Sequence, residues 1–337
     1  MGPRFLIVRQ DRLGDVVTST PLPREIKRVW PDARVTVLAR ARYEAVLRHN
    51  PHVDEILPSE EVFGEGLRAF WIGVRRLRAG RYTHALMLLP WSRSGWMTFF
   101  AGIPVRVGVG YALHHVLTGV KVVRRRMNMV HQHECDHALA FLKRLGVEPV
   151  DDTPEVHLAA AERDRAAVLR HAWLDGRDRL VGLHVGSGGS APNWTPDDYV
   201  DLARRLTADP RLRVIVTDPE PPPEILAVPG VVRIADGASL RDDIVAFTAL
   251  DVMVSSSTGP MHLCTALGVP TVTLFCPLPS CAPSLWGPRG NGGRVVLPAP
   301  GYCAQHCPGD PHDCTYADDG LPASQVAAVT ADVLSLA

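Results

Sequence analysis

The chain has 337 residues, of which 46% are hydrophobic and 21% are charged, so we expect a globular protein with two domains of about 150 residues each. Lys+Arg and Asp+Glu number 36 each, the net charge is zero, and we expect no nucleic-acid partner. No run approaches the roughly 18 to 20 apolar residues of a membrane span, and residues 1–4 lead directly into an apolar segment rather than a signal peptide. We therefore expect a cytoplasmic protein with at most peripheral contact at an inner membrane face.

The first half of the chain alternates apolar, β-rich runs with helical stretches, which is typical of a parallel sheet with helices on both faces. A helix over 134–145 is predicted to close this half, and the stretch of about 147–160, rich in Pro and acidic residues, reads as a linker. The predicted strands are 4–9, 35–39, 55–57, 84–89 and 105–109.

The second half repeats the alternation, so we predict an α/β protein with two Rossmann-like domains, residues 1–150 and 161–337, facing a central cleft. The predicted strands of the second domain are 180–185, 213–217, 231–234, 251–255 and 271–275.

Asp15 is the first candidate for chemistry, because it lies where the first strand gives way to a helix. Ligands of parallel sheets gather at the carboxyl ends of strands, and a carboxylate there can act as a general base. Asp is also a good helix N-cap, so spacing alone leaves both roles open, and Asp11 is a competing carboxylate. Arg9 and Arg12 flank this loop and are candidates for contacting an acceptor or a phosphate.

Two loops of the second half can bind an anion. Ser187, Gly188 and Gly189 follow a predicted strand, and glycines let backbone N–H groups approach an anion closely. Residues 257–262, S-T-G-P-M-H, open a short helix between two predicted strands. A helix N-terminus attracts phosphate, and Thr258 and His262 can add side-chain donors, although a histidine in such a helix is often a core residue.

Three segments in order resemble the ADP-heptose:lipopolysaccharide heptosyltransferases, glycosyltransferase family 9. They are F-L-I-V-R-Q-D-R-L-G-D at 5–15, V-G-L-H-V-G-S-G at 181–188 with Asn193-Trp194, and the S-T-G-P-M-H stretch that continues to Pro270-Thr271. The resemblance spans roughly residues 4–330 and implies the GT-B architecture. It implies an inverting transfer of a heptose, or a related sugar, from an ADP-sugar to a hydroxyl of lipopolysaccharide core, another glycan or a small natural product.

In this family the residue that matches Asp15 is the proposed base, and the transfer needs no cofactor. The chain departs from the family pattern at Ser257, where many members have Asp, and at Asn193, where they have Lys or Arg. Glu220 and Glu224 lie in place of a turn whose Glu holds the ribose. The donor-binding candidates are thus Ser187, Gly188, Gly189, Asn193, Glu220, Glu224, Ser257, Thr258, Gly259 and His262.

Two other functions stay open. A sugar-nucleotide epimerase or hydrolase of the same architecture would need an acid and a base at the donor sugar and no acceptor site. An inactive sugar-nucleotide-binding protein is the other alternative, because the family's Asp and Lys are missing.

Charge is divided unevenly along the chain. Residues 1–150 hold 23 Lys+Arg against 13 Asp+Glu, a net of +10, and the remainder therefore carries −10. This division predicts either recruitment of an anionic acceptor or membrane surface to the first domain, or attraction between the two domains. The basic clusters are Arg75, Arg76, Arg78 and Arg81, and Lys121, Arg124, Arg125 and Arg126.

Six of the seven cysteines lie after residue 263. Cys303, Cys307 and Cys314, with His306 and His312 nearby, are spaced like a small knuckle for zinc or iron, and Cys276 or Cys281 can supply a fourth thiolate. The alternative is a loop of reduced thiols.

Overall fold

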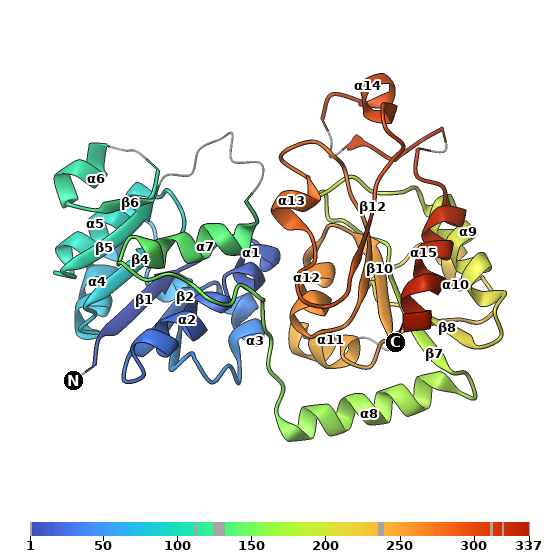
Figure 1. Cartoon of the computed structure of the whole chain (residues 1–337). Helices are drawn as coiled ribbons and strands as arrows, with labels where there is room; N and C mark the ends of the chain where they lie inside the picture. Colours follow the sequence, from blue (N-terminus) through green and yellow to red (C-terminus); the bar gives the residue numbers. More distant parts are fainter. Residues whose placement is uncertain are drawn as a thin grey trace. The chain divides into compact units, whose positions relative to one another are not determined.

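The computed structural model describes residues 2–110, 113–123, 132–234, 239–310, 313–318 and 320–336. The chain divides into two compact units, Met1–His157 and Leu158–Ala337. Each unit is built on one six-stranded sheet with helices packed around it (Figure 1).

The first unit has the strand order β3-β2-β1-β4-β5-β6, and neighbouring strands are parallel throughout. Its elements are β1 (Arg4–Val8), α1 (Leu13–Thr18), α2 (Pro21–Val29), β2 (Arg34–Ala39), η1 (Ala41–Tyr43), α3 (Glu44–Leu47), β3 (Glu55–Pro58), η2 (Ser59–Glu61), α4 (Gly66–Ala79), β4 (His84–Met87), α5 (Ser92–Phe100), β5 (Val105–Val109), α6 (Leu113–Thr118), β6 (Lys121–Val123) and α7 (Glu134–Lys143).

The second unit has the order β12-β11-β10-β7-β8-β9, again with parallel neighbours. Its elements are α8 (Ala160–Leu174), β7 (Arg179–His184), α9 (Pro196–Thr207), β8 (Leu212–Val216), α10 (Pro223–Leu226), β9 (Val231–Arg233), α11 (Leu240–Phe247), β10 (Val252–Ser256), α12 (Gly259–Ala266), β11 (Thr271–Leu274), α13 (Pro283–Trp286), β12 (Arg294–Val296), α14 (Tyr302–His306) and α15 (Ala323–Leu336).

Both sheets have the strand order of a Rossmann fold, so the predicted α/β class with two Rossmann-like domains is confirmed. Counted within each unit, the order is 3-2-1-4-5-6, and it reverses direction between β1 and β4 and between β7 and β10. Loops at the carboxyl ends of these strands form the topological switch point where such folds bind ligands. The loops of the three sequence segments singled out above follow β1, β7 and β10.

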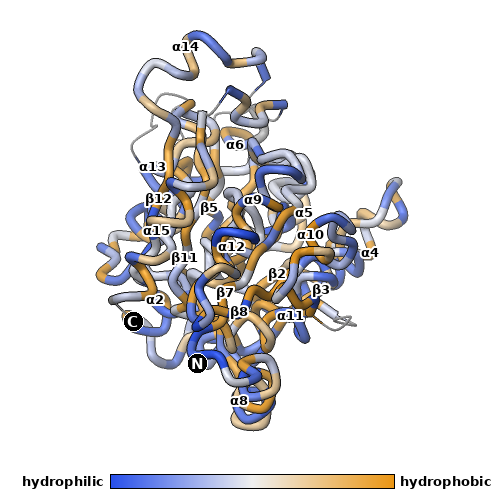
Figure 2. The backbone as a smooth tube through the Cα atoms, turned by 90° about the vertical axis from the view of Figure 1, so that its right-hand side faces the viewer, coloured by the Kyte–Doolittle hydropathy of each residue, from blue (hydrophilic) through white to orange (hydrophobic). Residues whose placement is uncertain are grey.

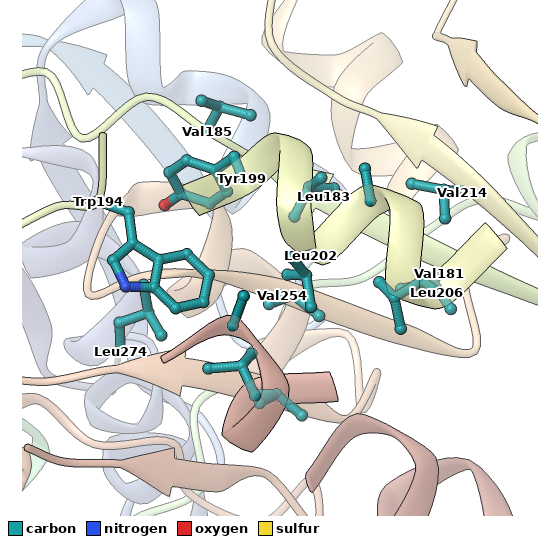
Figure 3. Packing of buried hydrophobic residues seen from close by; sticks show 14 of the residues in the cluster. Val181, Leu183, Val185, Trp194, Tyr199, Leu202, Leu206, Val214, Val254 and Leu274 are labelled. Atoms are coloured by element: carbon teal, nitrogen blue, oxygen red, sulfur yellow. The ribbon is translucent and has the colours of Figure 1, made fainter. Parts of the chain in front are cut away.

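Buried apolar side chains from the strands and their covering helices form the core of each unit. The strands are mainly orange, that is hydrophobic, in Figure 2. In the second unit Trp194 packs edge-on against Tyr199 of α9, with ring centroids 5.3 Å apart, among side chains of β7, β8, β10 and β11 (Figure 3). The Trp194 indole N–H also donates to the carbonyl of Leu321, 2.8 Å away, which ties this core to the segment before α15.

Two strands escaped the sequence prediction, β6 and β12. Each has three residues, and each pairs with a single neighbour at the edge of its sheet. β6 begins a run of basic residues and β12 follows a Gly-rich turn, so neither shows the apolar run that marked the inner strands. Their pairing is decided by the neighbouring strand rather than by local sequence.

The segment between α7 and α8 has no regular secondary structure but is fastened to the first unit. The Glu25 carboxylate accepts a hydrogen bond from the backbone N–H of Val150 at 2.9 Å. Arg24 forms an ion pair with Glu155, with 2.5 Å between Nη1 and Oε2. The segment that was predicted to be a linker from its polar composition is therefore bound to the first unit through its polar groups.

Asp251 ties α8 to the sheet of the second unit. Its carboxylate accepts the backbone N–H of Leu180 at 2.7 Å, both terminal nitrogens of Arg170 at 2.8 and 3.0 Å, and Arg179 at 3.1 Å. A mostly buried carboxylate with four donors is costly to alter, because each donor loses part of its compensation.

We expect Asp251→Asn to lower the free energy of unfolding by about 2 to 3 kcal/mol, because the two arginines lose their counter-charge. Urea unfolding measures this. The matched control is Asp201→Asn on α9, whose pair with Arg205 is about half exposed, and its effect should stay within about 0.5 kcal/mol. Equal losses in the two variants would contradict the role given to Asp251.

Candidate functional site

Arg9, directly after β1, is the centre of a buried ionic cluster. Its side chain is 2% exposed, and Nη2 donates to Asp15 Oδ1 and to Glu134 Oε1, both at 2.8 Å. Nε donates to the backbone carbonyl of Asp15 at 3.1 Å and lies 3.1 Å from Asp11 Oδ1. The guanidinium is thus surrounded by three carboxylates, one each from the β1–α1 loop, α1 and α7.

Asp15 is held by two contacts at the start of α1, where Arg12 rather than Asp15 is the N-cap residue. It is the third residue of α1, and its Oδ2 accepts the backbone N–H of Arg12 at 3.2 Å, as the acidic residue of a capping box does. Its Oδ1 is held by Arg9. Both carboxylate oxygens are therefore oriented at the carboxyl end of β1, while the Arg12 side chain is exposed and the Arg9 side chain is not.

Asp11 has an unusual protonation equilibrium. Burial raises the pKa of Asp11 to about 7 against the lowering effect of the Arg9 charge, and the negative charges of Asp15 and Glu134 raise it further. One guanidinium cannot neutralise three carboxylates at close range. Protonation of Asp11 therefore relieves the excess of negative charge in this cluster.

Glu134, the first residue of α7, was missed by sequence reasoning. It is 1% exposed and lies 125 residues away from Arg9 along the chain, so no local pattern relates them. An acidic residue in the first turn of a helix is ordinarily explained by its favourable interaction with the helix dipole. This explanation gave no reason to pair Glu134 with Arg9.

In the second unit, residues 187–190 form a tight turn after β7. The Ser187 carbonyl accepts the backbone N–H of Ser190 at 3.0 Å and its hydroxyl at 2.7 Å. Gly188 and Gly189 have φ of +55° and +65°, a conformation that favours glycine, and both are exposed. Their backbone can approach a ligand without a Cβ in the way.

Asp218 fixes the base of this turn. Its two oxygens accept the backbone N–H groups of Val185 and Gly186, each at 2.7 Å. His184 Nε2 lies 3.5 Å from Asp218 Oδ1, and burial lowers the pKa of His184 although the Asp218 charge opposes this. The sequence offered one signal for Asp218, because it is the first acidic residue after a strand of a Rossmann-like domain. An acidic residue at such a position can bind a ribose, but Asp218 binds backbone N–H groups instead.

Glu220 and Glu224, the acidic residues singled out in this segment, are both exposed, and Glu224 is the second residue of α10. Asn193 instead lies within the protein. Its Oδ1 accepts the hydroxyls of Tyr199 at 2.7 Å and Ser256 at 2.5 Å, and its Nδ2 donates to the Val185 carbonyl at 2.6 Å. One N–H of Asn193 is left for any further contact.

The loop after β10 presents the start of α12. Ser257 is half-buried and precedes Thr258, the N-cap, with Gly259 as the first helical residue. The Thr258 hydroxyl is buried and has no hydrogen-bond partner among the residues that the structure describes. His262 follows within the first turns, is 6% exposed, and meets the Trp286 ring edge-on at a centroid distance of 6.0 Å.

Within the described residues, the seven cysteines are thiols and not disulfides. In the parts of the chain that the structure describes, no group of three or more His, Cys, Asp or Glu side chains is arranged to hold a metal ion. Cys303 forms a hydrogen bond with Cys276. Burial raises the pKa of Cys303, and the nearby thiols of Cys314 and Cys307 raise it further. The metal expectation for Cys303, Cys307 and Cys314 stays a prediction.

Three features concern the remaining expectations. Arg75, Arg76 and Arg78 lie on α4 and are exposed. Arg124, Arg125, Arg126 and His312 lie outside the described residues. Within the described ranges, no helix is both long and apolar enough to span a bilayer.

The Asp11 assignment predicts a pH-dependent stability. A carboxyl whose folded pKa is raised stabilises the fold below its unfolded pKa, and this contribution is lost as pH rises through about 7. Asp11→Asn cannot ionise, so its free energy of unfolding relative to the parent should rise between pH 5 and pH 8.5. Chemical unfolding at the two pH values measures this, and a constant difference would contradict the assignment.

Comparison with known proteins identifies the family. A family model described as glycosyltransferase family 9 (heptosyltransferase) matches residues 71–299, more than half of the chain. Lipopolysaccharide heptosyltransferase 2 of Escherichia coli K12 is 28% identical over 322 residues, which cover 89% of each chain.

Solved structures agree in fold. A glycosyl transferase family 9 structure from Veillonella parvula has a TM-score of 0.81 at 18% identity, covering 99% of this chain and 98% of its own. Escherichia coli heptosyltransferase WaaC, solved with ADP, has a TM-score of 0.70 at 18% identity, covering 98% and 99%. The predicted GT-B fold is thereby confirmed, and the chain belongs to glycosyltransferase family 9, the heptosyltransferases.

Proposed function

We propose that this glycosyltransferase moves a heptose from ADP-heptose to a hydroxyl of a lipopolysaccharide core acceptor, with inversion at the anomeric carbon. The observation that carries the proposal is the Asp15 carboxylate, oriented by Arg9 and by the α1 cap at the carboxyl end of β1. The similarity to lipopolysaccharide heptosyltransferase 2 supports the donor and the acceptor class.

In this reaction Asp15 acts as the general base. The acceptor oxygen attacks the anomeric carbon as Asp15 takes the hydroxyl proton, and the carbon–oxygen bond to the diphosphate breaks so that ADP leaves with the electron pair. Arg9 and Glu134 act as positioning residues that hold Asp15 in one orientation. The exposed Arg12 is the cation of this loop that can meet an anionic acceptor.

The donor diphosphate binds at the switch point of the second unit. The N-terminus of α12 supplies unpaired N–H groups and the positive end of a helix dipole, and residues 187–190 supply a glycine turn. The unsatisfied Thr258 hydroxyl supports this placement, because a buried donor without a partner is costly unless a ligand satisfies it. His262 adds a side chain from the same helix, and Glu220 or Glu224 is the ribose candidate.

Asn193 and Ser257 stand where related enzymes carry Lys or Arg and Asp. The Asn193 side chain is hydrogen-bonded to Tyr199, Ser256 and Val185. The negative charge that develops on the diphosphate is therefore stabilised by the α12 dipole and the loop amides. No cofactor has a role in this transfer.

An assay of ADP release from ADP-heptose, with and without lipopolysaccharide core acceptor, tests the function. Acceptor-dependent release with a mass gain of one heptose on the acceptor is expected. Release without acceptor would identify a hydrolase, and ADP-heptose binding without any release would identify an inactive binding protein.

Asp15→Asn should lower kcat by about 10²-fold or more while the affinity for ADP stays near that of the parent, because a general base is lost and no donor contact is. Turnover and calorimetry measure the two quantities. The matched control is Asp32→Asn, an exposed carboxylate in a turn before β2, which should leave both unchanged. Parent-like turnover in a folded Asp15→Asn protein would remove the base assignment.

Thr258→Val tests the donor site, because it keeps the side-chain shape and deletes a hydroxyl that has no hydrogen-bond partner in the described part of the chain. We expect ADP affinity to fall by about 5- to 150-fold, the range for a hydrogen bond to a charged group, with no loss of thermal stability. His262→Ala should weaken ADP binding within the same range, whereas His171→Ala on the exposed face of α8 serves as control. Unchanged ADP affinity in calorimetry would assign Thr258 and His262 to the core.

A further inference from the structure

Five aromatic side chains gather on α4 and α5, which pack side by side in the first unit. Trp71 lies 5.2 Å from Phe100, measured between ring centroids, and Phe100 in turn lies 5.4 Å from Phe99. Phe70 and Trp96 complete the group, at 6.1 and 6.0 Å from Phe100. We call these five residues the aromatic face.

The outer side of this region is exposed to an unusual degree. Leu67 is 80% exposed, Ile72 51% and Trp71 47%, all on α4. On α6, which packs beside α5, Val116 is 79% exposed and Leu117 61%. Contiguous exposed apolar surface on neighbouring helices marks an interaction site rather than scattered surface residues.

Arginines alternate with these apolar side chains on α4. Arg68 and Arg75 are exposed and form no ion pair among the described residues, while the half-exposed Arg76 pairs with Glu61. Arg93 and Arg106 also lie over the rings of Phe70 and Phe99, each 5.4 Å from the ring centroid. The apolar surface is therefore interleaved with positive charge, and the unit that carries it holds the basic half of the chain.

A helix face of Trp and Leu with interspersed Arg suits the interface of an anionic bilayer. The rings and aliphatic side chains enter the boundary between headgroups and acyl chains, and the guanidinium groups meet lipid phosphates. Each arginine near an anionic lipid surface adds about 1 kcal/mol of attraction, so the positive charge of Arg68 and Arg75 favours anionic lipid as the occupant.

We propose that α4, α5 and α6 form a docking surface for anionic phospholipid bilayers, with Leu67, Trp71 and Ile72 as the inserted side chains and Arg68 and Arg75 as the lipid-phosphate contacts. Binding of lipid by this surface does not depend on the proposed transfer reaction.

Co-sedimentation of the full chain with vesicles tests the proposal. Vesicles of pure phosphatidylcholine are compared with vesicles containing 3 parts phosphatidylglycerol to 7 of phosphatidylcholine, a ratio of about 30% anionic lipid chosen to give a negative surface potential. We expect binding to the anionic vesicles, weak binding to the neutral ones, and a loss of binding as salt rises above about 0.15 M.

Two double variants examine the apolar and the basic contributions. Leu67→Gln with Ile72→Gln should reduce the partition coefficient at least about tenfold, because the inserted apolar area is removed. Arg68→Gln with Arg75→Gln should reduce it roughly fivefold for each arginine at low salt. These four side chains are exposed, so circular dichroism and thermal unfolding should match the parent.

The controls repeat the same chemistry elsewhere. Val150→Gln with Val168→Gln removes apolar side chains that are 77% and 69% exposed, and Arg144→Gln with Arg204→Gln removes two exposed charges from α9 and the end of α7. Both should bind vesicles as the parent does.

Three outcomes would overturn the proposal. Equal binding to neutral and anionic vesicles would exclude recognition of anionic lipid. Binding that neither the apolar nor the arginine double variant alters would exclude this surface. A dimer in analytical ultracentrifugation that Leu67→Gln with Ile72→Gln converts to monomer, without vesicle binding by the parent, would make the surface a contact between two copies of the chain. Transfer to a water-soluble acceptor is measured in parallel, so a failed docking surface and a failed reaction are distinguishable.

Discussion

A single buried guanidinium organises the first unit. Arg9 follows β1, and its side chain donates hydrogen bonds to Asp15 in the first turn of α1 and to Glu134, the first residue of α7. Three elements are therefore joined through one charge. A buried cation tolerates no loss of its partners, because an unpaired charge in the interior is strongly destabilising. The orientation of Asp15 is therefore imposed by the same contacts that hold the unit together, and the chemistry of the site cannot vary independently of the fold.

In the second unit the loop at the switch point is held by hydrogen bonds to backbone groups. Asp218 binds two consecutive N–H groups at the start of the glycine turn, and Asn193 bridges two hydroxyls beside it. The partners in these contacts are backbone N–H groups and hydroxyls, and the start of α12 adds helix N–H groups. The two Rossmann-like units share strand order but have opposite electrostatic designs at their switch points: a paired cation in the first, and oriented amides in the second.

How far the sequence alone reaches depends on the range of each interaction. The inner strands and the loops after β1, β7 and β10 could be predicted, because apolar runs and glycine-rich turns are local signals. The roles of Glu134 and Asp218 could not, because each is defined by a partner far away in sequence and each had an ordinary local explanation. Arg9 shows the same limit: an arginine beside a loop looks like a ligand contact until its burial among three carboxylates is known.

The left-handed turn at Gly188 and Gly189 has a consequence for the thermodynamics of binding. A glycine loop in an unfolded or mobile state has much conformational freedom to lose, and a ligand that orders it must supply that free energy. With Asp218 bound to Val185 and Gly186, and the Ser187 carbonyl closing the turn, the entropy of ordering is spent during folding. A nucleotide that binds at this loop, as proposed for the donor, would then need to supply little free energy to order it.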